Sequence, residues 1–144
     1  MTVAAMLKHK GHDVVSVQPT VSVAEITRLL SARRIGAVVV RNGAEPLLGV
    51  LSERDIIHAL AANGARALDM TARQLMTHAP HCATLDTTII EAMEMMTEGR
   101  FRHLPVIDRG ALIGIVSIGD VVKARIMQQA QEVDSLKAYV AGVG

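Results

Sequence analysis

The sequence predicts a mixed α/β (α+β) fold made of two copies of one small unit, each ordered strand, helix, strand, strand, helix. Three observations support this prediction. Half of the 144 residues are hydrophobic but only 1% are aromatic, so the chain can bury a sizeable core and that core must be aliphatic. The stretch 21–40 aligns with 87–106, and the segment GVLSERD (Gly49–Asp55) returns as GIVSIGD (Gly114–Asp120). Such internal repetition is typical of a duplicated unit.

In the first unit, residues typical of helix caps and turns mark the order strand, helix, strand, strand, helix. It is expected to contain a strand at 14–17, a helix, strands at 37–41 and 47–51, and a second helix. Ser22 and Glu25 have the spacing of a capping box at the start of the first helix. Asn42-Gly43 supplies the positive φ that a tight turn between the two strands needs. Ser52 marks the start of the second helix.

The second unit repeats these signals. It is expected to contain a short strand around 82–84, a helix, strands at 103–107 and 112–116, and a second helix. Thr88 and Glu91 reproduce the capping-box spacing. The turn between the strands is expected at Asp108-Arg109-Gly110, and the last helix is expected to begin after Ser117 and to cover about Ile118 to Tyr139.

The repeat also sets the expected domain boundaries. These are an N-terminal segment at 1–12, the first unit at 13–65, a linker at 66–80, the second unit at 81–126 and a C-terminal helical tail at 127–144. A three-stranded sheet leaves one apolar face uncovered. We therefore expect the units to pack through their sheets with pseudo-twofold symmetry.

Charge and composition exclude several classes of partner. The formal charge is +1, from 15 basic and 14 acidic residues, so no basic stripe indicates a nucleic-acid partner. Apolar runs are too short to span a bilayer, and the first residues lack the apolar core of a signal peptide. A single cysteine, Cys82, favours a reducing compartment. We expect a cytoplasmic protein that binds neither membrane nor nucleic acid.

The repeated motif carries the candidate chemistry. Gly49 and Gly114 would let the backbone bend or a ligand approach closely. The serine that follows can cap a helix whose free amides suit a phosphate. Asp55 and Asp120 come three residues later, where a carboxylate could accept hydrogen bonds from the vicinal hydroxyls of a ribose.

Less specific interpretations remain open. Each Ser–Asp pair could simply cap its helix, although two copies in register favour a ligand site. His78, His81 and Cys82 have no obvious further ligand, so no metal is expected. No catalytic motif stands out, and the chain is predicted not to be an enzyme.

At these residues the sequence resembles the cystathionine-β-synthase (CBS) domain family. The family signature of glycine, an apolar residue, any residue, Ser/Thr, two variable residues and Asp/Asn occurs twice, and IGAVVV and FRHLPVI resemble the family's strands. The resemblance covers nearly the whole chain. It implies tandem CBS domains, often called a Bateman module, most like the small stand-alone bacterial CBS-pair proteins.

The resemblance also implies roles for individual residues in clefts between the paired units. Asp55 and Asp120 would contact ribose, and Ser52 and Ser117 phosphate or ribose. Adenine would lie near two groups of residues, which are Ser16, Val17, Gly36 and Ala37 in one site, and Cys82, Thr84 and His103 in the other.

Phosphate also needs positive charge. The candidate cations are Arg54, Arg102, His103 and Lys123. Arg102-His103 stands where the γ subunits of AMP-activated kinase, in the same family, carry basic phosphate contacts. The first unit has Gly36-Ala37 there, so the two sites are expected to be unequal.

We therefore expect a regulatory, energy-sensing module that binds AMP, or ADP or ATP, with NAD(H) as second choice and no metal. Binding would shift the relative orientation of the units, and an unknown downstream protein would read that shift. The alternatives are a ligand-independent dimerisation or scaffold protein and, less favoured, a vestigial enzyme fragment. A homodimer is expected from apolar residues on 22–34 and 56–62, and the segment with Leu136, Tyr139 and Val140 could pack across a partner.

Overall fold

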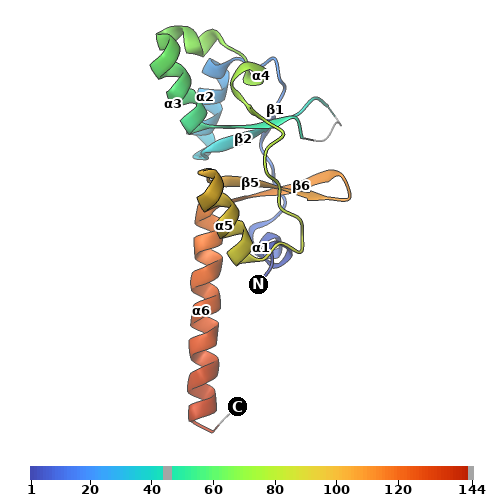
Figure 1. Ribbon diagram of the computed structural model, residues 1–144, viewed down its shortest axis with the longest axis vertical. Coiled ribbons are helices and arrows are strands. Elements are labelled where there is room, and N and C mark those ends of the chain that lie inside the picture. The colour runs from blue at the N-terminus through green and yellow to red at the C-terminus, as the bar shows by residue number, and fades with distance from the viewer. Residues whose placement is uncertain (44–46, 143–144) are drawn as a thin grey trace. The chain divides into compact units, whose positions relative to one another are not determined.

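The computed structural model describes residues 1–43 and 47–142, and it confirms a mixed α/β fold with two repeats (Figure 1). Contacts divide the chain into two compact units. The first-repeat unit comprises Asp13–His81 with Asp108–Ile113, and the second-repeat unit comprises Met1–His12, Cys82–Ile107 and Gly114–Gly144. Each unit is described in turn.

The first-repeat unit contains one four-stranded sheet and the helices that follow its strands. Its strands are β1 (Ser16–Val17), β2 (Ala37–Val40), β3 (Gly49–Ser52) and β4 (Thr77–His78), in the spatial order β1-β2-β3-β4. Its helices are α2 (Val23–Arg33), α3 (Glu53–Asn63), the 3₁₀ helix η1 (Gly64–Asp69) and α4 (Ala72–Leu75). β1 runs parallel to β2, and the other neighbours are antiparallel.

An aliphatic core holds this unit together, as the composition predicts. All four residues of β2 are buried, which explains why the strand reads as an unbroken apolar run. Val38 and Leu51 pack with Ile26 of α2 and Ile56 of α3 in one cluster. Residues 44–46 of the predicted turn lie outside the described residues, whereas Gly43 has the expected positive φ of 60°.

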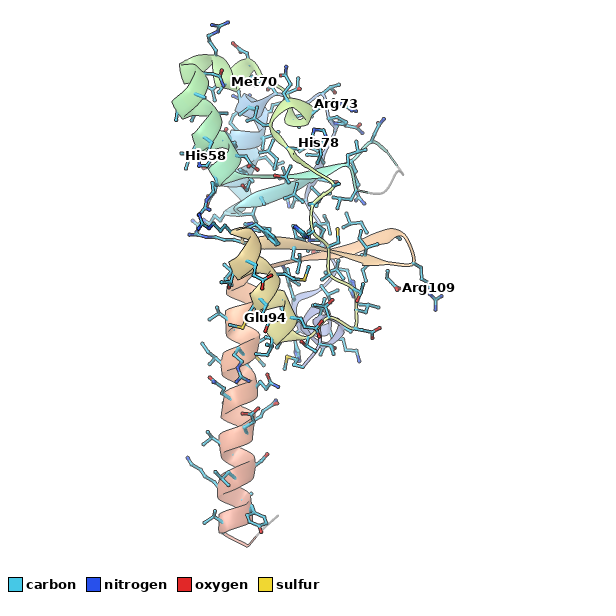
Figure 2. The ribbon with its side chains drawn as sticks, in the orientation of Figure 1. His58, Met70, Arg73, His78, Glu94 and Arg109 are labelled. Atoms are coloured by element: carbon cyan, nitrogen blue, oxygen red, sulfur yellow. The ribbon has the colours of Figure 1, made fainter. Side chains whose placement is uncertain are left out.

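The predicted linker at 66–80 is structured and belongs to this unit. It contains most of η1, all of α4, and β4, which pairs with β3 through Gly49 opposite His78 and Val50 opposite Thr77. Met70, Arg73 and His78 of this segment are labelled in Figure 2. The sheet therefore has four strands instead of the three expected. Sequence reasoning missed β4 because a two-residue strand is too short to show an alternating pattern.

The second-repeat unit is built from α1 (Val3–Lys10), α5 (Ile89–Gly99), α6 (Ile118–Val140) and most of a β-hairpin of β5 (His103–Asp108) and β6 (Ala111–Ser117). The tip of this hairpin, Asp108–Ile113, is grouped with the first-repeat unit. The hairpin turns at Arg109 and Gly110, whose φ angles of 50° and 79° match the primed turns that hairpins prefer. Arg109 is labelled at this tip in Figure 2.

The prediction of a strand around 82–84 is wrong in the second repeat. Within these three residues the structure has no strand, and Ala83 forms an isolated parallel bridge to Val106 of β5. The Ala83 N–H donates to the Pro105 carbonyl, and the Ala83 carbonyl accepts from Ile107. The chain then turns, because the Thr84 N–H donates to Thr87 Oγ1 at 3.0 Å instead of continuing a ladder.

The N-terminal helix α1 completes the core of the second-repeat unit. The Val3 N–H donates to the Thr87 carbonyl at 2.8 Å, and the Ile89 N–H donates to the Met1 carbonyl at 3.1 Å. Val3, Met6 and Leu7 are buried. The helix expected from about Ile118 to Tyr139 is confirmed as α6. Its C-terminal half runs on past α1 and α5 of the same unit (Figure 1). Across the described residues, none of the helices has the length and apolar character needed to cross a bilayer.

Candidate functional site

The first Ser–Asp pair forms a closed hydrogen-bonded ring at the start of α3. The N–H and Oγ of Ser52 both donate to Asp55 Oδ2, at 2.8 and 3.1 Å, and the Asp55 N–H donates back to Ser52 Oγ at 3.3 Å. This is a capping box with aspartate in the position that glutamate usually takes. The carboxylate is half-buried and its direction is fixed by the helix cap.

The second pair has the same geometry at the start of α6. Ser117 donates through N–H and Oγ to Asp120 Oδ2 at 2.8 and 3.0 Å, and the Asp120 N–H returns a bond to Ser117 Oγ at 3.2 Å. Equivalent distances in the two repeats agree to 0.1 Å. The duplicated sequence therefore gives duplicated local geometry.

A strand-to-helix hydrogen bond places a second predicted group beside each pair. The Glu53 N–H donates to the Gly36 carbonyl at 2.9 Å, and Ala37 lies opposite Ser52 in the β2–β3 register. In the second repeat the Ile118 N–H donates to the Arg102 carbonyl at 2.8 Å. The structure thus brings Gly36-Ala37 to the first pair and Arg102-His103 to the second.

Other predicted residues of the first repeat lie further along the sheet. Ser16 and Val17 pair with Val39 and Val40, about 7 Å or more along β2 from Ala37 at the usual rise of a strand. Arg41 donates from Nε to Ser16 Oγ at 3.3 Å. This arginine is a cation that sequence reasoning missed, since it follows the strand outside the motif.

The corresponding segment of the second repeat holds Cys82 and Thr84 on either side of the Ala83 bridge. Cys82 is half-buried, and desolvation raises the pKa of its thiol. A raised pKa disfavours the thiolate, which agrees with the expectation of a packing cysteine over a nucleophile. Thr84 is exposed and shares its hydroxyl with Thr87 at 3.3 Å.

The two motif glycines make room for other segments of the same unit. A Cβ on Gly49 would lie 2.6 Å from the Thr77 carbonyl oxygen and 2.7 Å from the Met76 sulfur. A Cβ on Gly114 would lie 2.9 Å from Leu7 Cδ2. Close packing against backbone therefore already requires glycine at position 49, whereas at position 114 a larger residue would displace the end of the Leu7 side chain. The role of both glycines toward a ligand stays a prediction.

Lys10 of α1 makes the two pairs different. Its ammonium forms an ion pair with Asp120 Oδ2 at 2.5 Å and donates to the Ile115 carbonyl at 2.6 Å. Partial burial raises the pKa of Asp120, but hydrogen bonds from Lys10 and Ser117 and the charge of Lys10 outweigh it, so the pKa is below its ordinary value. Nothing in the local sequence indicates Lys10, because it precedes Asp120 by most of the chain.

The predicted cations differ in placement. Arg54, Arg102 and Lys123 are exposed and His103 is half-buried. Lys123 shares a pocket of about 170 Å³ in the second-repeat unit with Asp120, Lys10 and His9. Among the described residues, no three His, Cys, Asp or Glu side chains group closely enough to hold a metal ion.

Comparison with models of known protein families identifies the family to which the two repeats belong. The model of the CBS domain matches residues 6–62 and again residues 72–126. The chain belongs to the CBS domain family. As a CBS-domain pair it is similar to the CBS-domain protein ATU1752 of Agrobacterium tumefaciens, with 46% identity and a TM-score of 0.84 over 87% of this chain and 99% of that one.

Two further relatives bear on function. The CBS pair is 28% identical to CBSX2, solved in complex with AMP, with a TM-score of 0.73 over 89% of this chain and 98% of that one. It is 33% identical to the mitochondrial CBS protein CBSX3 of Arabidopsis thaliana over 84% of this chain. The chain spans 61% of the length of CBSX3 and 22% of CBSCBSPB5 from the same plant.

Proposed function

We propose that this CBS-domain pair is a regulatory, non-catalytic module that binds an adenine nucleotide, with AMP preferred over ADP and ATP and NAD(H) as second choice. The observation that carries the proposal is the equal geometry of the two Ser–Asp pairs. Two carboxylates are held in one orientation by their helix caps, so ordering them on binding costs little entropy. The AMP complex of the relative CBSX2 supports the choice of ligand.

In this proposal the carboxylates of Asp55 and Asp120 accept hydrogen bonds from ribose hydroxyls. The capping bonds use Oδ2, and a carboxylate has about four lone-pair directions for acceptance. In the second site, the phosphate would be bound by the positively charged or hydrogen-bonding side chains of Arg102, His103 and Lys123. Lys10 already occupies the Asp120 carboxylate, so the two sites would differ in affinity and in preferred charge.

The regulatory output would come from a shift between conformations. A nucleotide shifts such an equilibrium only by its difference in affinity for the two states. We propose that a protein partner, not yet identified, reads the shift, and that the module works as a homodimer. Support for a homodimer comes from α3, where Ile57 and Leu60 are exposed beside a hollow of about 620 Å³ between α2 and α3.

Isothermal titration calorimetry with AMP, ATP and NADH tests the binding proposal. Wild type should release or absorb heat with AMP, and the Asp55→Asn/Asp120→Asn variant should bind AMP at least about tenfold more weakly, because one lost charged hydrogen bond is worth about 1.5–3 kcal/mol. The matched control is Asp69→Asn, which changes an exposed carboxylate at the end of η1. The proposal would be contradicted if none of the three nucleotides gave a heat of binding. It would also be contradicted if wild type and the Asp55→Asn/Asp120→Asn variant bound AMP with equal affinity.

A second candidate is a ligand-independent scaffold. The specific observation in its favour is that both motif carboxylates already have a structural role as helix caps. If the Asp55→Asn/Asp120→Asn variant keeps its fold, its assembly and its cellular effect, the scaffold explains the protein better.

A further inference from the structure

Five of the seven exposed large hydrophobic residues of α6 follow a coiled-coil repeat. They are Val122 (44% exposed), Ile126 (60%), Val133 (49%), Leu136 (63%) and Val140 (78%), whereas Met127 and Tyr139 lie outside the repeat. With Gln129 included, the steps along the helix alternate between four and three residues. This is the spacing of the a and d positions of a heptad, which forms a seam between two helices. Ile126, Val133 and Val140 take position a, and Val122, Gln129 and Leu136 take position d.

This seam lies on a different face of α6 from the one that packs within its own unit. The buried residues of α6 are Val121 and Ala124, where the helix contacts α5 and α1. At 100° per residue the centre of the seam is about 130° around the helix from the centre of these two residues. The C-terminal half of α6 continues beyond α1 and α5, and its side chains project around it (Figures 1 and 2). The seam is thus available to another molecule.

We propose that α6 pairs with α6 of a second copy of the chain as a parallel, two-stranded coiled coil. The a positions described above are all β-branched, which together with leucine at d favours two parallel strands. Leu136 supplies that leucine at one of the three d positions. Gln129 places one polar layer in the middle of the seam. Such a layer fixes register at some cost in stability.

Charges beside the seam select the parallel orientation. In a parallel pair the g residue of one helix faces the e residue five positions later on the other. Glu132 at g then faces the partner's Lys137 at e, twice by symmetry. In an antiparallel pair e faces e, which would set Lys123 against the partner's Lys137. A seam of 19 residues is about 28 Å long, so we expect it to work together with other contacts between copies.

Disulfide trapping in the full chain tests this interface directly. In a Cys82→Ser background, Leu136→Cys places two thiols in one d layer across the twofold axis, near enough for a disulfide. The matched control is Gln131→Cys, an exposed position on the opposite face of α6. We expect Leu136→Cys to form a covalent dimer under mild oxidation much faster than Gln131→Cys. Equal rates for the two variants would overturn the proposal.

The same trapping distinguishes the two orientations. When Ile126→Cys chains are mixed with Leu136→Cys chains of different mass, an antiparallel pair would give mainly mixed dimers, and that result would also overturn the proposal. A parallel pair gives disulfide-linked dimers in which both chains carry the same substitution.

Charge reversal provides a second readout that keeps the seam intact. Glu132→Lys alone should weaken dimerisation by about fivefold at low salt, and Glu132→Lys/Lys137→Glu should restore it, as measured by sedimentation equilibrium. Failure of the double variant to recover contradicts the parallel charge pairing. All measurements are made without nucleotide and repeated with Asp55→Asn/Asp120→Asn, so the result is independent of the proposed nucleotide binding.

Discussion

The ammonium of Lys10 distinguishes two Ser–Asp pairs that otherwise match. It is held by the Asp120 carboxylate and the Ile115 carbonyl. Asp55 forms no comparable ion pair with any residue in the described ranges. A carboxylate whose pKa is lowered in the folded state stabilises the fold at pH values above its ordinary pKa, which is 3.8 for an aspartate. That contribution is lost as the pH falls through the folded-state pKa.

We therefore predict that Lys10→Met lowers the free energy of unfolding at neutral pH by about 0.5–1 kcal/mol, the usual range for a partly exposed pair. The difference from wild type should shrink as the pH falls from about 4 to 2, because protonated Asp120 no longer attracts the ammonium. Urea unfolding across this pH range measures both effects.

The matched control is Lys8→Met, which removes an exposed lysine of the same helix. It should leave stability nearly unchanged at every pH. A loss in Lys10→Met that is the same at neutral and acid pH would show that packing of the lysine stem, and not the ion pair, is responsible.

Residues whose partners are close in sequence could be predicted, and residues with distant partners could not. The Ser–x–x–Asp caps were predicted from their spacing, since both partners lie in one helical turn. Lys10 reaches Asp120 only through the fold. The same is true of Gly49, whose contact with Thr77 explains the glycine without reference to a ligand.

At the scale of elements, both first helices of the repeats end in the same strained way. Arg34 closes α2 and Arg100 closes α5, with φ angles of 54° and 56° in the left-handed region. A residue with a Cβ pays about 1–2 kcal/mol there, and glycine avoids most of that cost. Both positions follow the last helical turn, where glycine is the usual choice.

We predict that Arg34→Gly stabilises the protein by about 0.5–1 kcal/mol, because relief of the left-handed strain exceeds the extra entropy of glycine in the unfolded chain. Arg33→Gly, one residue earlier and inside α2, should instead destabilise by about 1 kcal/mol. Thermal or urea unfolding of the pair gives the comparison. A loss of stability in Arg34→Gly would mean that its side chain makes contacts worth more than the strain.

Helices and strands, like single residues, could be predicted where their signals are local in sequence and not where they depend on distant segments. The starts of α2 and α5 and both ends of α6 were predicted to within one residue, because caps and apolar spacing are local signals. The strand at 82–84 was predicted wrongly, because it was inferred from the repeat as the equivalent of 14–17. In the structure the Thr84 N–H donates to Thr87 instead of continuing a strand. β4 pairs with β3 at Gly49, where a Cβ would meet residues 76 and 77, and no local pattern in 77–78 indicates this long-range contact.

At the scale of the whole molecule, segments that are neighbours in sequence do not always belong to the same compact unit. Residues 1–12 precede the first repeat but belong to the second-repeat unit. Val3, Met6 and Leu7 are buried there, and Leu7 fills the space that Gly114 leaves open. The amino-terminal segment was expected to flank the pair, and no pattern in α1 alone identifies which repeat it joins.

This division predicts that a core substitution in α1 affects the two repeats unequally. Leu7→Ala should cost about 2–5 kcal/mol through the cavity it leaves, and the loss should fall on the second-repeat unit. In hydrogen exchange under native conditions, amides of β5, β6 and α5 should exchange faster, whereas amides of β2 and β3 should keep more of their protection. The control Lys8→Ala, on the exposed side of the same helix, should leave both sets unchanged. If protection falls equally in β2–β3 and β5–β6, the two units unfold as one, and the first repeat depends on α1 as strongly as the second.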